Sequence, residues 1–419
     1  MATKTNQPGS SGLTSAGYLV PFIIVTALFF IFGFITNLNM ALVPHLKAIF
    51  TLPYAWAMLA ESAFFLAYFV FSAPTSKLIE TIGYKRTMVV SLFIQVIGCL
   101  MFIPAAKMVS FPLFLTAVFV VGAGVTALQT SANPYVSILG PESSSSIRLN
   151  LAQAFNSIGG TIAPLIAGAY ILTDPAQLAS PASVANTVRI PYMLIAGGLL
   201  LLGIAVAFMH LPHITQTQEF RPGKEGDPVL SRSIWSYKHT VLGALGIFFY
   251  VGVEVGLASI AVNYFHLQGM SSAKTASYLV SLYWLGALIG RLLGAGIMTK
   301  VRAGKLLGIF GTLAAVSITI SMFTSGQVAI GALVLCGFFN SVMFPNIFTL
   351  GIAGLGPMTS KGSGLIMTAV VGGAVIPYLL GALADRVGIQ MSFVLPVICY
   401  VYIAFYGFVG HKPTRTITA

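Results

Sequence analysis

Long apolar stretches separated by short polar breaks run through this 419-residue chain. Uncharged runs cover residues 87–106, 152–173, 362–384 and 387–410, and no charged residue lies between positions 306 and 360. A helix needs about 20 apolar residues to span the hydrocarbon core of a bilayer, so each run is long enough. The sequence does not show the alternating segments of about 10 residues that are typical of membrane β-barrels. The pattern therefore predicts an all-α membrane protein.

Twelve membrane-spanning helices are expected from these stretches. The first six cover residues 18–46, 54–79, 87–106, 111–139, 147–172 and 190–211, and the second six cover residues 239–265, 273–298, 306–323, 328–352, 362–383 and 391–411. The polar, proline-containing segment 212–238 predicts a cytoplasmic linker between an N-terminal bundle, residues 18–211, and a C-terminal bundle, residues 239–411. Residues 1–17 and 412–419 are expected to be cytoplasmic tails, the first of them flexible.

The two predicted bundles share one spacing of glycine and proline. Gly159-Gly160, Pro164 and Gly168 recur as Gly372-Gly373, Pro377 and Gly381, and Pro134 matches Pro345 at nearly the same separation. Small residues let membrane helices approach closely. Two matches in register, about half a chain apart, indicate two pseudo-symmetric six-helix bundles, which is the repeat pattern of the major facilitator fold.

The charge of the chain reports orientation. The sequence is 57% hydrophobic and only 7% charged, with a net charge of +12. The basic residues are spread over loops and form no basic helix, so a nucleic-acid partner is not expected. With a cytoplasmic amino terminus, most of the 21 Lys and Arg lie inside, and the exceptions are Lys47, Lys107, Arg189, Lys274 and Arg386. We expect a multi-pass membrane protein with both termini cytoplasmic and the lipid bilayer as its surroundings.

Two acidic residues stand out among the nine, because Glu61 and Glu254 lie deep inside apolar segments. A carboxylate at the bilayer centre costs at least ~2.5 kcal/mol unless water or a partner receives it. Each of them therefore predicts a polar cavity, in which it takes up a coupling cation or accepts hydrogen bonds from a polar substrate. The alternative is a structural ion pair or a protonated, hydrogen-bonded packing group.

Amide side chains form a second group of candidate binding residues. They are Asn37 in the first predicted span, Gln129 and Asn133 on one face of the fourth, Gln153 and Asn156 on one face of the fifth, and Asn340 and Asn346 around the Pro345 break. An amide both donates and accepts, as a sugar hydroxyl does, so the set predicts a sugar site. The alternative is that these amides join neighbouring helices. Trp284 either stacks on a sugar ring or simply packs.

Enzyme signals are weak. Residues 122–127 fit a loose G-x-G-x-x-A pattern, but they lie inside a continuous apolar span without a strand–turn–helix context. The six histidines lie near membrane edges without metal-ligand spacing. Cys99, Cys336 and Cys399 lie within apolar spans and are expected to be packing residues. We therefore expect neither an enzyme nor a cofactor other than a coupling ion.

The sequence resembles the fucose–galactose–glucose symporter family of the major facilitator superfamily. The matching stretches include Gly33-Phe-Ile-Thr-Asn37-Leu-Asn39, Ala132-Asn-Pro134-Tyr, Arg148-Leu-Asn-Leu-Ala-Gln153-Ala-Phe-Asn156-Ser, Tyr250-Val-Gly-Val-Glu254 and Gly362-Ser-Gly-Leu365. The resemblance implies twelve helices, a central sugar site and cation-driven uptake, with Gln129 and Glu254 closer to the glucose/galactose branch.

The chain also departs from that family. The fucose permease has an Asp where Met40 stands and a Glu where Gln129 stands, and both acids are tied to proton coupling or sugar recognition there. Their absence suggests that the coupling acid has moved to Glu61. We expect hexose uptake by H⁺ or Na⁺ symport through alternating access. The alternatives are a facilitative uniporter, a transporter of another polar solute such as an amino sugar, and a membrane sugar sensor that does not transport.

Overall fold

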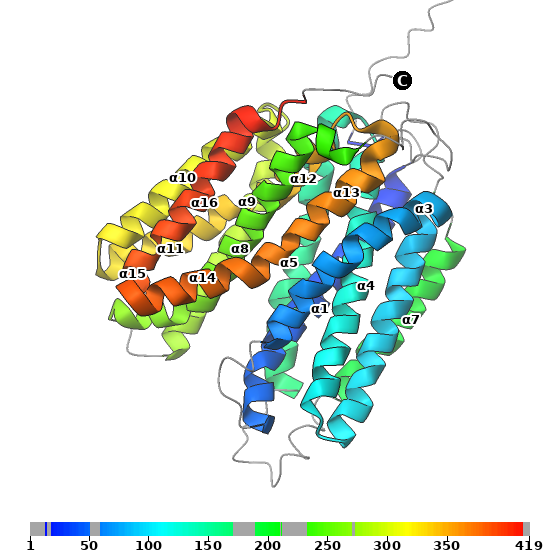
Figure 1. The fold of residues 1–419 in the computed structure, drawn as a ribbon, viewed down its shortest axis with the longest axis horizontal. Helices are drawn as coiled ribbons and strands as arrows, with labels where there is room; N and C mark the ends of the chain where they lie inside the picture. The colour runs from blue at the N-terminus through cyan, green and yellow to red at the C-terminus, as the bar shows by residue number, and fades with distance from the viewer. Residues whose placement is uncertain are drawn as a thin grey trace, which may run out of the picture.

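The computed structural model describes residues 13–14, 18–50, 59–170, 189–209, 211, 233–269 and 273–413. Side chains are not described at residues 39–50, 59–61, 164–170 and 273–278. Every regular element in this part of the chain is helical (Figure 1), so the prediction of an all-α protein is confirmed. The first half contains α1 (Leu19–Phe50), α3 (Leu59–Lys107), α4 (Phe111–Ile138), α5 (Ser145–Tyr170) and α7 (Arg189–Phe208). The second half contains α8 (Lys238–Leu267), α9 (Ala273–Ile297), α10 (Ala303–Phe323), α11 (Gly326–Asn340), α12 (Met343–Ile352), α13 (Thr359–Thr368), α14 (Gly372–Val387), α15 (Ile389–Ser392) and α16 (Val394–Phe405).

The described residues contain ten helices that are long and apolar enough to cross a membrane. One of them, Ser62–Lys107, is 46 residues long and contains most of the predicted spans 54–79 and 87–106. Gly83 divides it, because its φ of 81° and ψ of 169° are not helical. Such a conformation suits glycine, which has no Cβ to clash with the backbone. The predicted span 147–172 extends beyond the described residues.

Several predicted spans are made of more than one element. The span 328–352 is α11 followed by α12, with a break at Ser341 and Val342 just before Pro345. The span 362–383 begins earlier than predicted, at a short 3-10 helix, Gly356–Met358, and then bends at a second one, Ala369–Val371, before α14. The last span ends in a π-helical turn, Tyr406–Gly410. Proline removes one donor from the hydrogen-bond ladder of a helix and glycine weakens the helix, and such breaks are tolerated where membrane helices line a cavity.

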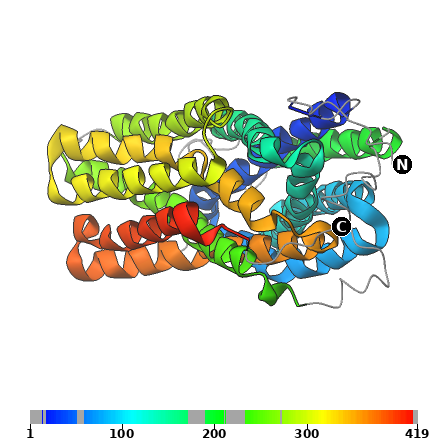
Figure 2. The ribbon, with the colours of Figure 1, turned by 90° about the horizontal axis from the view of Figure 1, so that it is seen from above.

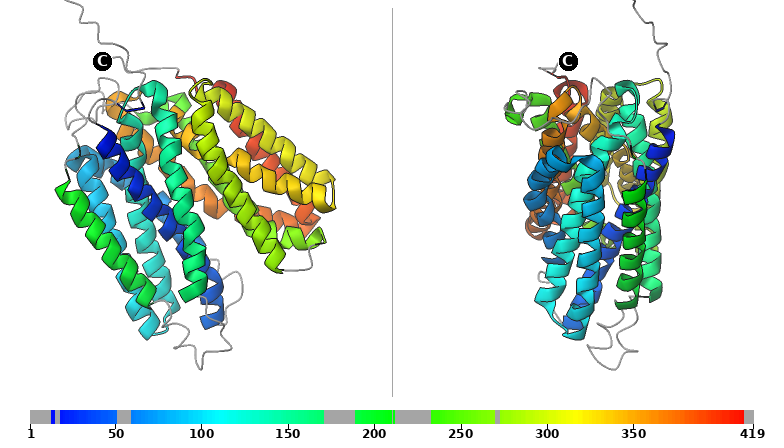
Figure 3. Two further views of the ribbon diagram at one scale, coloured as in Figure 1. Left: turned by 180° about the vertical axis from the view of Figure 1, so that it is seen from behind. Right: turned by 90° about the vertical axis from the view of Figure 1, so that its right-hand side faces the viewer.

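The helices form two groups that meet at one end of the molecule. In the first group α3 packs along α4 and α7, and α1 packs along α5; in the second, α8 packs along α14, and α10 along α11 and α16. The groups contact each other mainly through α3 with α13 and α5 with α9. Figure 2 shows the two groups side by side, and Figures 1 and 3 show that they are joined at the end where α12 and α13 lie and spread apart at the opposite end. We call the joined end the closed end.

Polar pairs hold the closed end together. Ser146 on α5 and Thr349 on α12 are hydrogen-bonded at 2.6 Å, and Asn150 Nδ2 donates to Asn346 Oδ1 at 2.9 Å. Ser363 Oγ donates to the carbonyl of Thr130 at 2.8 Å. Each pair joins the two groups of helices and is buried, so the closed end is a layer of matched hydrogen bonds.

At the closed end of the first group, Arg148 binds the segment between α4 and α5. This side chain is fully buried and donates to the carbonyl oxygens that follow the last turn of α4, among them Gly140 and Pro141. It also donates to the carbonyl of Leu13 at 2.9 Å. Leu13 belongs to the segment predicted to be a flexible tail, and here it is bound to the bundle.

Candidate functional site

A cavity of about 910 Å³, including its open part, lies between the two groups of helices. Its walls come from α1, α3, α4 and α5 on one side and from α8, α9, α12 and residue 370 on the other. Six of the residues predicted to bind substrate line it: Asn37, Gln129, Gln153, Asn156, Glu254 and Trp284. The structure therefore brings together residues that are as much as 247 positions apart (284 − 37) in the sequence.

The amides all stand on the first group of helices. Gln129 Nε2 donates to the hydroxyl of Tyr68 at 2.7 Å, which fixes the orientation of this amide in the wall. Asn37 Nδ2 donates to the carbonyl of Gly33 at 2.9 Å, and Asn156 Nδ2 reaches the carbonyl of Phe29 at 3.4 Å. The amide oxygens of these side chains remain able to accept hydrogen bonds from a ligand in the cavity.

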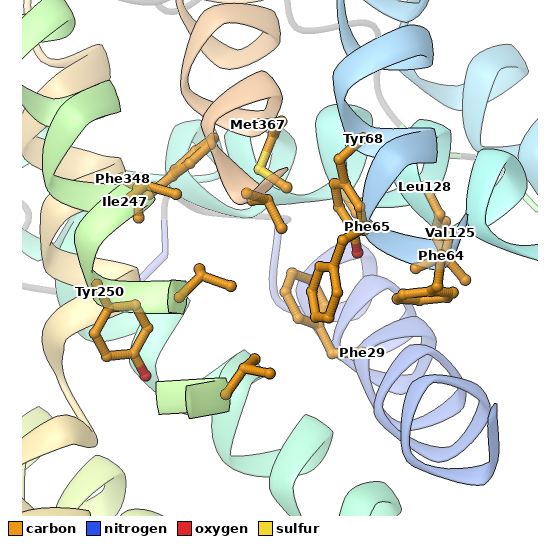
Figure 4. Packing of buried hydrophobic residues seen from close by; sticks show 14 of the residues in the cluster. Phe29, Phe64, Phe65, Tyr68, Val125, Leu128, Ile247, Tyr250, Phe348 and Met367 are labelled. Atoms are coloured by element: carbon orange, nitrogen blue, oxygen red, sulfur yellow. The ribbon is translucent and has the colours of Figure 1, made fainter. Parts of the chain in front are cut away.

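Aromatic rings form the apolar part of the wall. Phe32, Phe64, Phe65, Tyr68, Tyr250, Trp284 and Phe344 line the cavity. Figure 4 shows Phe65 and Tyr68 on one side and Tyr250 on the other. Trp284 is held edge-on to Tyr283, with ring centroids 5.5 Å apart. Rings next to amides offer a sugar both a surface for its C–H face and partners for its hydroxyls.

Glu254 is the acidic side chain in the lining of the cavity. It lies on α8, half-buried, and its Oε1 accepts a hydrogen bond from the hydroxyl of Tyr250 at 2.6 Å. Tyr250 itself is 1% exposed, so this partner is fixed. Glu254 is thus in the lining of the cavity and is bound to one buried hydroxyl, and its role in binding or coupling stays a prediction.

Arg291 on α9 also lines the cavity, and sequence reasoning missed it. The side chain is 6% exposed. Its Nη1 donates to the carbonyl of Gln153 at 3.2 Å and to Ser157 Oγ, and its Nε donates to the carbonyl of Ser341 at 3.2 Å. The count of basic residues by side assigns Arg291 to the cytoplasm, although it lies inside the predicted span 273–298. A charge inside a predicted apolar span is the signal that could have identified it.

Three predicted binding residues lie outside the cavity lining. Asn133 is fully buried, and its Nδ2 approaches Met367 Sδ at 3.6 Å. Asn340 Nδ2 donates to the hydroxyl of Tyr283 at 2.6 Å. Asn346 accepts from Asn150 at the closed end. In this structure the three amides join helices, which was the alternative interpretation of the group.

The side chain of Glu61, predicted to couple the cation, is not among those that the structure describes. The side chains of Asn39 and Met40 are not described either. The backbone of Glu61 belongs to α3, one turn before Phe65 and two turns before Tyr68. Both aromatic residues line the cavity. The role of Glu61 in coupling stays a prediction.

A family comparison decides the identity of the fold. The family model described as "Major Facilitator Superfamily" matches residues 24–375. The chain belongs to the major facilitator superfamily. It is 43% identical over 422 residues to a glucose/galactose transporter of Brucella abortus, covering 98% of this chain and 100% of the relative. It is 33% identical to the L-fucose-proton symporter of Escherichia coli, covering 93% of this chain and 92% of the relative.

A solved structure of this superfamily has the same architecture. The fucose transporter FucP, in the outward conformation, superposes with a TM-score of 0.83 at 32% identity, covering 93% of this chain and 98% of that one. The resemblance to the fucose–galactose–glucose symporter family is thereby confirmed, and the chain is a transporter and not an enzyme.

Proposed function

We propose that this major facilitator takes up a glucose- or galactose-like hexose together with a proton by alternating access. The observation that carries the proposal is the cavity between the two groups of helices, in which amides of one group and Glu254 of the other face the same space. Neutral amides and aromatic rings suit an uncharged polyhydroxylated ligand, and a single carboxylate suits a transported proton. The relatives named glucose/galactose transporter and L-fucose-proton symporter support the same substrate class and the same ion.

The proposal includes a membrane arrangement. Twelve helices form two six-helix bundles, residues 18–211 and 239–411, joined by a linker over residues 212–238. The closed end faces the cytoplasm, because the basic residues around Gly83 and between α9 and α10 then lie inside, as the positive-inside rule requires. Both termini are cytoplasmic, the protein acts as a monomer in the inner membrane, and the cavity is open to the outside. Substrate enters from there, and rocking of one bundle against the other exposes the site to the cytoplasm.

Uptake of labelled sugars into proteoliposomes tests the proposal. We expect accumulation of glucose or galactose above the outside concentration under an imposed pH gradient, and none under a Na⁺ gradient at equal pH. Accumulation under the Na⁺ gradient alone would show that the coupling ion is Na⁺ and not H⁺. Equilibration without accumulation would identify a uniporter, and sugar binding without counterflow would identify a sensor. Selective uptake of an amino sugar would show that the substrate is an amino sugar and not a neutral hexose.

A further inference from the structure

Arg291 joins the two groups of helices at the floor of the cavity. Its Nη1 crosses to α5, where the carbonyl of Gln153 and Ser157 Oγ accept from it. Its Nε stays within its own group on the carbonyl of Ser341, which lies at the break between α11 and α12. The side chain is thus anchored at one end in its own group and bound to the other group at its tip.

The acceptors of Arg291 are neutral, although the carboxyl group of Glu254 lines the same cavity. Among the described residues, Arg291 donates to two carbonyls and one hydroxyl. Glu254 lines the same cavity and is close enough to Arg291 to interact electrostatically. The other titratable side chains that act on Glu254 in this part of the chain are Tyr250 and Tyr283, both on the helices of its own group. A nearly buried guanidinium is stabilised far more by a carboxylate than by neutral oxygens.

Opening of the closed end changes what Arg291 can reach. The layer of pairs at that end joins α5 to α12, and Arg291 joins α5 to α9, so α5 must leave all of these partners together. Gln153 O and Ser157 Oγ then move away with the first group, whereas Glu254 stays with Arg291 in the second. The guanidinium loses its two acceptors on α5, and it keeps the carbonyl of Ser341 and the carboxyl group of Glu254 within its own bundle.

We propose that Arg291 is a positioning residue that exchanges its contacts on α5 for Glu254 when the closed end opens. The ionised form of Glu254 attracts Arg291 and favours the opened closed end, and the protonated form leaves Arg291 on α5 and favours the state seen here. The proton is therefore taken up while the cavity is open to the outside and released after it opens to the cytoplasm. The inference rests on the proposed symport, because it says how the protonation of Glu254 is coupled to the side of the membrane to which the cavity opens.

The test measures the closed end directly, without sugar. Spin labels on cysteines introduced by Thr81→Cys and Lys300→Cys, both at exposed sites, report the distance across that end in proteoliposomes at pH 5 and pH 8. We expect a long-distance population in the otherwise unchanged protein that grows at pH 8. Arg291→Gln and Glu254→Gln abolish this pH dependence. Arg291→Lys, which keeps the charge, retains it, and this variant separates loss of charge from loss of packing.

A matched pair on α5 completes the test. Ser157→Ala removes one acceptor of Arg291, so we expect a several-fold larger long-distance population at both pH values with the pH dependence retained. Phe155→Leu, at an exposed site on the same helix and outside the cavity lining, leaves both unchanged. A pH dependence that persists in Arg291→Gln overturns the inference, and so does its absence from the protein with native Arg291. Sugar counterflow in the same vesicles tests the proposed function separately, because the distance measurement needs no sugar.

Discussion

Gly159 and Gly372 hold the same place in the two groups of helices. A Cβ atom on Gly159 would overlap the carbonyl oxygen of Phe30 on α1, and a Cβ on Gly372 would overlap the carbonyl oxygen of Phe248 on α8. Each glycine thus lets one helix touch the backbone of its neighbour, as small residues do in membrane bundles. The repeated sequence motif is a repeated contact between helices.

Alanine at either glycine should destabilise the protein. The atom that the new methyl group meets is backbone and cannot move aside as a side chain can, so we expect Gly159→Ala and Gly372→Ala each to cost roughly 1–3 kcal/mol. Thermal unfolding in detergent measures the loss. Gly381 belongs to the same motif but has open space around it, so Gly381→Ala is the control and should unfold like the unchanged protein. Equal stability of all three variants would contradict this account.

Glu254→Gln should abolish accumulation of sugar and leave the yield of folded protein nearly unchanged. Gln is close in size and can still accept from Tyr250, but it carries no exchangeable charge. If Glu254 were instead one half of a structural pair, its removal would strand a buried charge and cost about 3–5 kcal/mol of stability. Uptake into proteoliposomes under a pH gradient gives the answer, and normal accumulation by the Gln variant would refute the coupling role.

The amides in the wall should matter more for binding than the amide behind it. Gln153→Ala and Gln129→Ala remove groups that face the cavity, so each should weaken sugar binding by roughly 1–3 kcal/mol. Asn133→Ala changes a side chain outside the lining and should weaken it less. Isothermal calorimetry with the transported sugar compares the three variants. An unchanged affinity of both Gln variants would remove α4 and α5 from the binding site.

The contact between Asn150 and Asn346 should govern access and not affinity. Loss of one buried hydrogen bond, about 0.5–1.5 kcal/mol, should let the closed end open several-fold more often in Asn150→Ala. Asn346→Ala should act in the same way, and the double variant should add little, because both remove one bond. The rate at which a thiol reagent labels a cysteine introduced on the cavity side of these contacts measures how often the closed end opens. Strictly additive effects of the two changes would show that the contact is not shared.

Glu61→Gln should uncouple the carrier. Met40 and Gln129 cannot titrate, so Glu61 is the acid that remains within the predicted spans of the first bundle. We expect counterflow of sugar to survive and gradient-driven accumulation to be lost. If both activities survive, the coupling proton uses Glu254 alone. If both disappear, Glu61 is needed for binding or folding and not for coupling.

Hydrophobic periodicity predicts the membrane spans and the polar faces of the helices. It does not predict at which level along a helix a polar residue meets the cavity. Gln129 and Asn133 were placed on one face of a single helix, and they do share α4. Gln129 nevertheless lines the cavity, whereas Asn133 lies one turn nearer to the end where α13 packs on α4. The depth at which the two groups meet depends on contacts between distant segments, which a local pattern does not contain.

Arg291 shows a second limit. A predicted span stays strongly apolar even when it contains one basic residue. A count that divides all basic residues between the two sides of the membrane therefore treats that residue as part of a loop. Its partners, Gln153 and Ser157, belong to a helix more than a hundred positions away. The acids were found because a single buried carboxylate is expensive on its own terms. The same reasoning applied to basic residues would have singled out Arg291.

Three contacts at the closed end join uncharged partners, Ser146 with Thr349, Asn150 with Asn346 and Ser363 with a carbonyl, and in a fourth Ser360 Oγ donates to Glu80 Oε1 at 3.0 Å. A transmembrane potential of 100 mV does about 2.3 kcal/mol of work on each elementary charge that crosses it, and almost none on a neutral pair. Breaking and re-forming the three neutral contacts therefore moves almost no electrical charge. In the proposed symport the voltage dependence then comes from the transported ion, from the ionisable side chains of the cavity and from Glu80, so loss of the membrane potential lowers the driving force for uptake without acting on the three neutral contacts.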